Sequence, residues 1–301
     1  MAYQLLDFFT DPLLRAPTIG SMLMCAASSL IGVIVFIRRK SLVGEALSHA
    51  AYPGLVLSAG LVSFFIPILD ERYFALFLVG AFCSSLLGLY FFTVLQKRFK
   101  VKGDSALCFM LSSFFGIGVL FAGRMQVTSP LYYRQIQTFL YGQVATMTDM
   151  HIGLYGGLFL LVIFFIALFY RSIQLVYFDK QFAQVLGVST RIFEAFFCVL
   201  LAIAVVVAMK SVGIVLLSGM LIAPALAARQ FSHKLSTIFV LASLLGAFSG
   251  FFGNYFSVQL SGWFLDSRLF LPTGPMIVLV SSAISIFSLL VSPKRYLRRK
   301  V

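Results

Sequence analysis

Long stretches of apolar residues recur along this chain at close to the length of a membrane-spanning helix. An α-helix needs roughly 20 predominantly apolar residues to cross the hydrocarbon core of a bilayer. The segment Leu131–Val144 is too short and too polar to cross, so we expect it to be re-entrant or to lie at the membrane interface. We predict about nine spans, near Pro17–Ile37, Gly44–Ile68, Tyr73–Leu95, Ser105–Phe121, Ile152–Tyr170, Phe193–Ala208, Val212–Ala228, Leu235–Phe256 and Pro275–Val291.

The composition excludes a soluble fold. Hydrophobic residues make up 60% of the 301 residues, charged residues 11%, and the mean hydropathy is +1.00. A soluble core cannot hide this much apolar surface. A membrane β-barrel would instead show short segments of alternating polarity. The sequence therefore predicts an all-α, polytopic helical bundle of about eight to nine transmembrane helices, with residues 1–301 as a single transmembrane domain.

The net charge of +13 comes from basic residues in short loops beside the apolar runs. Lysine and arginine concentrate in the cytoplasmic loops of membrane proteins. If the spans alternate, the N-terminus lies outside and the C-terminus lies on the cytoplasmic side of the membrane. The predicted cytoplasmic clusters are Arg38–Lys40, Lys97–Lys102, the stretch with Lys180 and Arg191, Arg229 with Lys234, and Lys294–Lys300.

One acid and one histidine, Glu45 and His49, lie four residues apart within an otherwise apolar stretch. Four residues is about one helical turn, so both side chains project from one face. Ionisable groups inside a membrane are energetically costly and usually functional. A carboxylate and an imidazole suit a divalent transition metal, and two ligands form an incomplete site from which a cation can leave. The alternative is that Glu45 bonds the preceding loop and His49 only packs against a neighbouring helix.

A second informative segment runs from Tyr177 to Val188 in a predicted cytoplasmic loop. It begins with an acid suited to a helix N-terminus and ends at a glycine, so it predicts one short helix outside the membrane. The helix is either an ordinary connection or a docking element for a motor subunit. The residues that we assign to docking are Asp179, Phe182, Ala183 and Gly187.

The chain has no means of its own to hydrolyse ATP. No lysine follows a glycine, so the phosphate-binding loop that ends in Gly-Lys-Ser/Thr is absent from the sequence. The energy for uphill transport would come from a partner or from an ion gradient. Pro53 and Pro224 each interrupt an apolar run, and we expect each to kink a membrane helix.

Three stretches of the sequence stand out as motifs: LVGEALSHAAYPG, AMKSVGIVLLSGMLIAPALAAR and LPTGPMIVLV. They resemble the membrane permeases of the manganese, zinc and iron class of ABC importers. In that family the three motifs correspond to the second helix, to a later membrane stretch and to the entry to the last helix. The segment from Phe182 to Gly187 resembles the family's coupling segment. The resemblance implies a non-catalytic permease with a second permease subunit, ATPase subunits and an extracytoplasmic metal-binding protein. It further implies Glu45 and His49 as transient pathway ligands, with metal as cargo and no permanent cofactor.

Four weaker candidates accompany these motifs. Asp104 fits a family position, but capping of its own helix explains it equally well, and Asp149 with His151 forms either an outer metal contact or a solvated loop. We expect His233 to face lipid or the ATPase.

The principal rival function is a gradient-driven secondary metal-ion transporter that uses Glu45 and His49 as a proton relay. An intramembrane enzyme is disfavoured because no further cluster completes a catalytic metal site.

Overall fold

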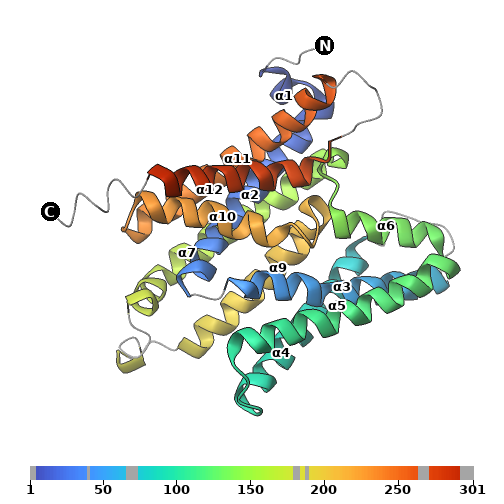
Figure 1. Ribbon diagram of the computed structural model, residues 1–301, viewed down its shortest axis with the longest axis horizontal. Helices are drawn as coiled ribbons and strands as arrows, with labels where there is room; N and C mark the ends of the chain where they lie inside the picture. The colour runs from blue at the N-terminus through green and yellow to red at the C-terminus, as the bar shows by residue number, and fades with distance from the viewer. Residues whose placement is uncertain are drawn as a thin grey trace. The chain divides into compact units, whose positions relative to one another are not determined.

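The computed structural model describes residues 5–38, 41–65, 74–178, 184–186, 190–263 and 271–291, and within these the regular structure is helical (Figure 1). Eight helices in this described part are long and apolar enough to cross a membrane. The elements are α1 (Asp7–Thr10), α2 (Pro12–Ile37), α3 (Leu42–Phe65), α4 (Phe74–Lys97), α5 (Gly103–Thr128), α6 (Pro130–Tyr141), η2 (Val144–Thr146), α7 (Asp149–Phe178), α9 (Thr190–Val212), α10 (Leu217–Phe231), α11 (Leu235–Trp263) and α12 (Thr273–Val291).

The chain divides into two compact units. The first comprises residues 1–41, 143–194 and 218–301, and the second comprises residues 42–142 and 195–217. The first therefore contains α2, α7 and α10 to α12 with the first turn of α9, and the second contains α3 to α6 with the rest of α9. That residues 1–301 form one permease domain stays a prediction.

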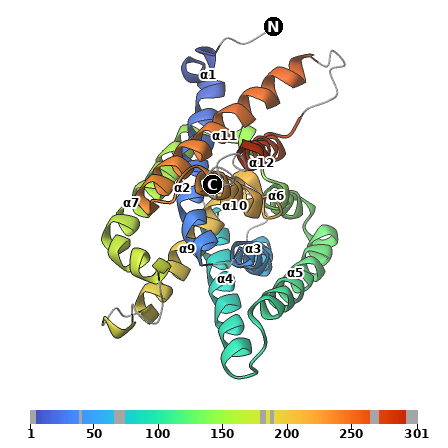
Figure 2. The same cartoon turned by 60° about the vertical axis from the view of Figure 1, so that its left-hand side comes forward.

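In the first unit, α2 packs along α11, and both views show these helices side by side (Figures 1 and 2). Small residues permit the close approach. A Cβ atom added at Gly246 would lie 2.5 Å from Ser29 Oγ, and one added at Gly250 would lie 2.7 Å from the Ser21 carbonyl oxygen. Membrane helices associate through such van der Waals contact because lipid is as apolar as the helix surface. Gly246 and Gly250, four residues apart on α11, thus lie at the α2–α11 interface.

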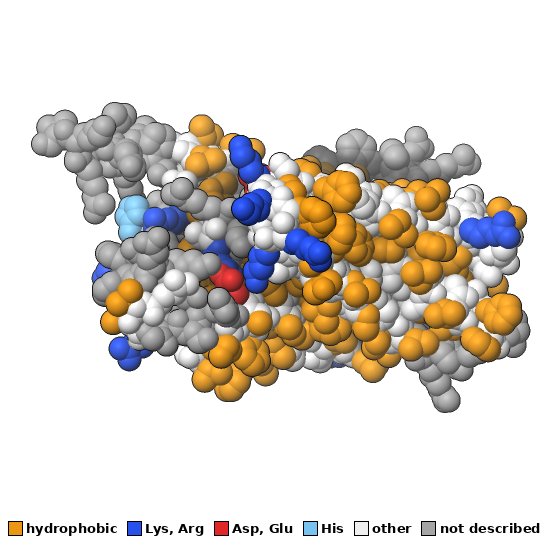
Figure 3. Space-filling view, turned by 90° about the horizontal axis from the view of Figure 1, so that it is seen from below, with side chains coloured by type: hydrophobic (Ala, Val, Ile, Leu, Met, Phe, Trp, Pro, Cys, Tyr) orange, Lys and Arg blue, Asp and Glu red, His pale blue; other side chains and the backbone are white. Residues whose placement is uncertain are grey.

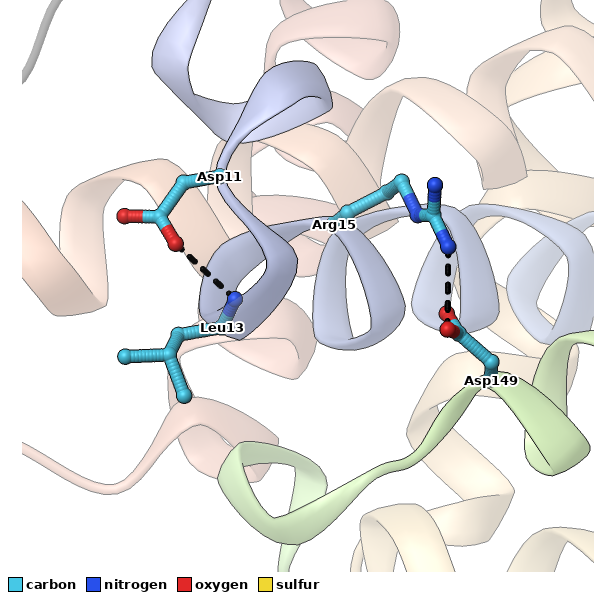
Figure 4. Close-up of polar contacts among 4 residues, drawn as sticks. All are labelled: Asp11, Leu13, Arg15 and Asp149. Atoms are coloured by element: carbon cyan, nitrogen blue, oxygen red, sulfur yellow. Dashed lines mark hydrogen bonds and ion pairs between the residues drawn. The ribbon is translucent and has the colours of Figure 1, made fainter.

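The N-terminal end of α2 is fixed by two polar contacts (Figure 4). Asp11 Oδ1 accepts a hydrogen bond from the backbone N–H of Leu13 at 2.9 Å, which caps the helix. Arg15 Nη2 lies 2.9 Å from Asp149 Oδ2 at the start of α7. Both side chains of this ion pair are largely exposed, so it contributes little to stability.

Helix α10 contains Pro224, and two serines of α12 contact the carbonyl groups around it. Ser285 Oγ donates to the Ala223 oxygen at 2.6 Å, and Ser288 Oγ donates to the Ala227 oxygen at 3.1 Å. Side chains of neighbouring helices commonly stabilise the polar backbone next to a proline in a membrane helix. The structure places Pro224 inside α10 and Pro53 inside α3, and the predicted kinks remain predictions.

In the second unit, α3 packs against α4 and α5 (Figure 2). Ser84 Oγ of α4 donates to the Ala50 carbonyl of α3 at 2.7 Å, and a Cβ atom at Gly80 would lie 2.6 Å from the Ser58 side chain. Gly80, Ser84 and Gly88, spaced four residues apart on α4, therefore form a ridge of small residues at the interface with α3. The ridge at Gly153 and Gly157 on α7 has no described atom within 4 Å of an added Cβ, so within the described chain it forms no such interface.

Leu131–Val144, predicted not to cross the membrane, forms the twelve-residue helix α6 and then η2. Tyr132, Ile136 and Phe139 form its buried face, and the helix ends at Gly142 with a φ of 77°. Only glycine adopts this left-handed conformation readily. The backbone there closely approaches Val212 at the end of α9.

Apolar side chains cover much of the visible surface, as expected for a protein in contact with lipid (Figure 3). Predicted and observed spans agree to within a few residues at most ends. The exceptions are longer helices, such as α7, which extends eight residues beyond the predicted end at Tyr170. The segment predicted as the span Val212–Ala228 forms α10, which begins at Leu217 and has only 15 residues, so it is not among the eight helices long enough to cross a membrane.

Candidate functional site

Helix α3 holds both predicted metal ligands. It begins at Leu42, so Glu45 lies in its first turn, where the helix dipole favours a negative charge. His49 lies one turn further along the same helix, and both residues are half-buried among neighbours that are mostly buried. The structure therefore brings the carboxylate and the imidazole onto one face, as their spacing predicted.

The His49 ring packs against an aromatic ring, and one of its nitrogen atoms has no hydrogen-bond partner among the described residues. Its ring meets Phe115 of α5 edge to face, with ring centroids 4.7 Å apart, and Tyr52 lies 5.5 Å from the same phenyl ring. The Nδ1 atom is buried and has no hydrogen-bond partner among the described residues. Buried polar atoms in proteins are nearly always paired. An imidazole nitrogen without a partner is available to a ligand such as a metal ion or water.

Ser48 links the pair to the break between α9 and α10. Its Oγ atom is 2.8 Å from the Glu45 carbonyl oxygen and 3.4 Å from the Ile214 carbonyl oxygen. The chain turns there because Gly213 has a φ of 89°, and the Ile214 N–H bonds the Phe139 carbonyl at the end of α6. Ser48 was not a candidate from the sequence, because a serine within an apolar helix does not indicate which distant residue it contacts.

Within the described residues, no group of three or more His, Cys, Asp or Glu side chains could hold a metal ion. Glu45 and His49, the predicted pair, could together offer a cation only two ligands, so a bound cation would stay open to further ligands. A transported ion needs such weak ligation because it must leave as well as enter.

The weaker candidates lie apart from this pair. Asp104 is exposed in the first turn of α5, where no side-chain capping bond forms. Asp149 pairs with Arg15, and the His151 Nδ1 atom accepts from the Thr148 N–H at 3.2 Å, which ties it to the start of its own helix. His233 lies exposed, with its Nδ1 atom 3.4 Å from an Arg229 nitrogen.

The predicted docking residues Asp179, Phe182, Ala183 and Gly187 lie outside the described residues. Between them, residues 184–186 begin as helix and end in a turn. The side chains of Val185 and Leu186 are 84% and 55% exposed.

The first unit also has an apolar groove of about 340 Å³. Leu30 of α2, Phe159 and Ile163 of α7, and Phe239 and Leu244 of α11 are among its lining residues. The groove has almost no polar surface, so it offers a metal ion no ligands.

The eight long apolar helices of the described chain define a multi-span membrane protein, and comparison with known proteins assigns its family. The family model described as ABC 3 transport family matches residues 10–292. The chain belongs to this family, and it is a multi-pass permease of the bacterial cytoplasmic (inner) membrane.

Relatives with named functions are similar over most of the chain. A probable metal transport system membrane protein of Chlamydia pneumoniae is 36% identical over 97% of this chain and 67% of its own length. The manganese transport system membrane protein MntC of Bacillus subtilis is 31% identical over 93% and 61%. The zinc transport system membrane protein TroC of Treponema pallidum is 31% identical over 97% and 93%. The chain thus spans about two thirds of the length of the first two relatives and most of the third.

Solved structures support the fold. PsaBC from Streptococcus pneumoniae, in complex with Fab, superposes with a TM-score of 0.80 at 26% identity over 99% of both chains. An inward-facing putative metal-chelate type ABC transporter gives a TM-score of 0.63 at 20% identity, over 94% of this chain and 88% of its own. The all-α permease fold predicted from the sequence is therefore confirmed.

Proposed function

We propose that this chain is the permease subunit of an ATP-binding-cassette importer for a divalent transition metal: manganese, zinc or iron. Glu45 and His49 are its transient pathway ligands, and the metal is cargo rather than a permanent cofactor. The observation that carries the proposal is the half-buried pair on one face of α3, where the buried Nδ1 atom of His49 has no partner among the described residues.

The ligand types limit the cargo. A carboxylate oxygen and an imidazole nitrogen are shared by manganese, iron and zinc sites, whereas Ca²⁺ and Mg²⁺ prefer oxygen ligands alone. Relatives of this chain are named as manganese and zinc transport proteins, which agrees with this ligand set. A second permease subunit, identical or related, would contribute ligands that α3 lacks.

The energy comes from a partner in this proposal. The chain itself is non-catalytic, ATPase subunits hydrolyse ATP, and an extracytoplasmic binding protein delivers the metal. The segment around Asp179, Phe182, Ala183 and Gly187 docks on the ATPase, supported by the exposed apolar side chains of Val185 and Leu186. Family membership favours this function over the gradient-driven transporter.

Metal uptake by cells that carry the whole transporter tests the site. Glu45→Ala and His49→Ala are compared with the wild type at matched membrane expression, for manganese, zinc and iron. We expect both variants to lose at least tenfold in uptake of the transported metal, because each removes one of two ligands. His233→Ala, which removes an exposed histidine, is the matched control and should leave uptake unchanged. Normal uptake in both α3 variants would return Glu45 and His49 to a packing role.

A further inference from the structure

A partly buried ion pair joins the C-terminal end of α2 to the first turns of α9. The guanidinium Nη2 atom of Arg38 lies 2.6 Å from Glu194 Oε1. The side chain of Arg38 is only 12% exposed and that of Glu194 is 32% exposed. The pair is therefore more sheltered than the Arg15–Asp149 pair at the other end of α2, whose side chains are 45% and 65% exposed. Shelter from water and salt makes the attraction between the charges stronger.

Aromatic contacts extend this junction to α7. The Arg38 guanidinium lies over the Phe193 ring, with Cζ 5.9 Å from the centroid, which is within the range of a cation–π contact. Phe193 is buried, and its ring lies 6.1 Å from Phe165 and 5.8 Å from Phe169 of α7. The end of α2 and the start of α9 thus share one cluster with the α7 helix that leads into the predicted docking segment.

Each residue of the ion pair lies close in sequence to one of the two predicted functional segments. Glu194 follows Gly187, the last predicted docking residue, by seven residues, and Arg38 precedes Glu45 by the same number. The direct route along the chain from the docking segment back to Glu45 is more than a hundred residues long. Through the Arg38–Glu194 contact, the route consists of two short segments, residues 187–194 and residues 38–45.

We propose that Arg38 and Glu194 are positioning residues that couple the ATPase-docking segment to the metal ligands. The ion pair keeps the end of α2 and the start of α9 together, so that a displacement of the docking segment also moves the short connection into α3. This inference rests on the proposed function, since it requires docking on an ATPase and metal ligation on α3.

The coupling ratio, ATP hydrolysed per metal ion imported, tests the pair in proteoliposomes that contain the complete transporter. We expect Arg38→Gln and Glu194→Gln to retain ATP hydrolysis within twofold while metal import falls at least tenfold. Arg38→Lys keeps the charge and should import within threefold of the wild type. The double variant Arg38→Gln/Glu194→Gln should be no worse than either single variant, because both changes remove one interaction.

Arg15→Gln is the matched control, because it breaks the exposed ion pair at the opposite end of the same helix. It should leave the coupling ratio within twofold of the wild type. Glutamine variants of Arg38 and Glu194 with a wild-type coupling ratio would overturn the inference. A wild-type transporter that imports none of the three metals would overturn the proposed function itself, so the two failures are distinguishable.

A cross-link keeps the test decisive if the single variants fail to assemble. Cysteines at positions 38 and 194, in a background without the four native cysteines, are joined by a cleavable bifunctional thiol reagent. We expect import to be at least threefold higher in the cross-linked protein than after cleavage, because the link replaces the ion pair. Import that is blocked by the cross-link and restored by cleavage would show that the two helix ends separate during transport, which contradicts the proposal.

Discussion

At the scale of single residues, the first turns of α3 set the chemistry available to a cation. Glu45 places a carboxyl group in the first turn of this helix, and His49 places an imidazole ring against the Phe115 ring. Aspartate at this position would carry the same carboxylate on a side chain that is one methylene shorter. The extra methylene keeps the charge but moves the carboxylate oxygen relative to His49, and the distance between two ligands affects which ion fits.

Shortening this acid should alter metal preference more than overall transport. In Glu45→Asp we expect import to continue within about fivefold of the wild type, with a changed order of inhibition by competing manganese, zinc and iron. Glu45→Gln removes the charge and should lower import of every metal at least tenfold. Competition against a radiolabelled metal measures both effects. Identical competition profiles for Glu45→Asp and the wild type would show that the reach of the carboxylate does not matter.

At the scale of helices, close packing at small residues holds α3 in place against α4. Gly54 faces the backbone of Gly80, and Ser84 Oγ donates to the carbonyl of Ala50, the residue that follows His49. The position of the candidate ligands therefore depends on a helix interface that leaves no room for an added side chain. Added atoms in such a contact typically cost about 1 to 3 kcal/mol.

Gly54→Ala should destabilise the protein because the new methyl group meets backbone atoms of α4 that cannot move independently. We expect the apparent unfolding temperature in detergent to fall by roughly 2 to 10 °C. Gly123→Ala on α5 is the matched control, since an added Cβ there has no described atom within 4 Å. An equal change in both variants would mean that the loss of glycine, and not the α3–α4 contact, determines the effect.

At the scale of the whole molecule, the positions of the basic loops predict the orientation in the membrane. The loop between α10 and α11 holds His233 and Lys234 and should be cytoplasmic, whereas the start of α7 should lie outside. The Arg38–Glu194 junction then lies on the same side as the docking segment, as its proposed role requires.

Labelling of single cysteines by a membrane-impermeant maleimide tests this orientation in the background without native cysteines. Met150, 85% exposed near the start of α7, and His233 are the two positions. We expect Met150→Cys to react in intact cells and His233→Cys to react only after the membrane is made permeable. The reverse pattern would place the C-terminus outside and separate the docking segment from any cytoplasmic ATPase.

The sequence by itself determined the helical membrane fold, most of the spans and the placement of Glu45 and His49 on one face of one helix. These features follow from hydrophobic length and from the period of a single helix, which are local properties. Only the tertiary structure brought Ser48 to Ile214, Phe115 to His49 and Arg38 to Glu194. Each of these contacts joins segments that are distant in sequence, and nothing in the period of one helix specifies which residue of another segment it will meet.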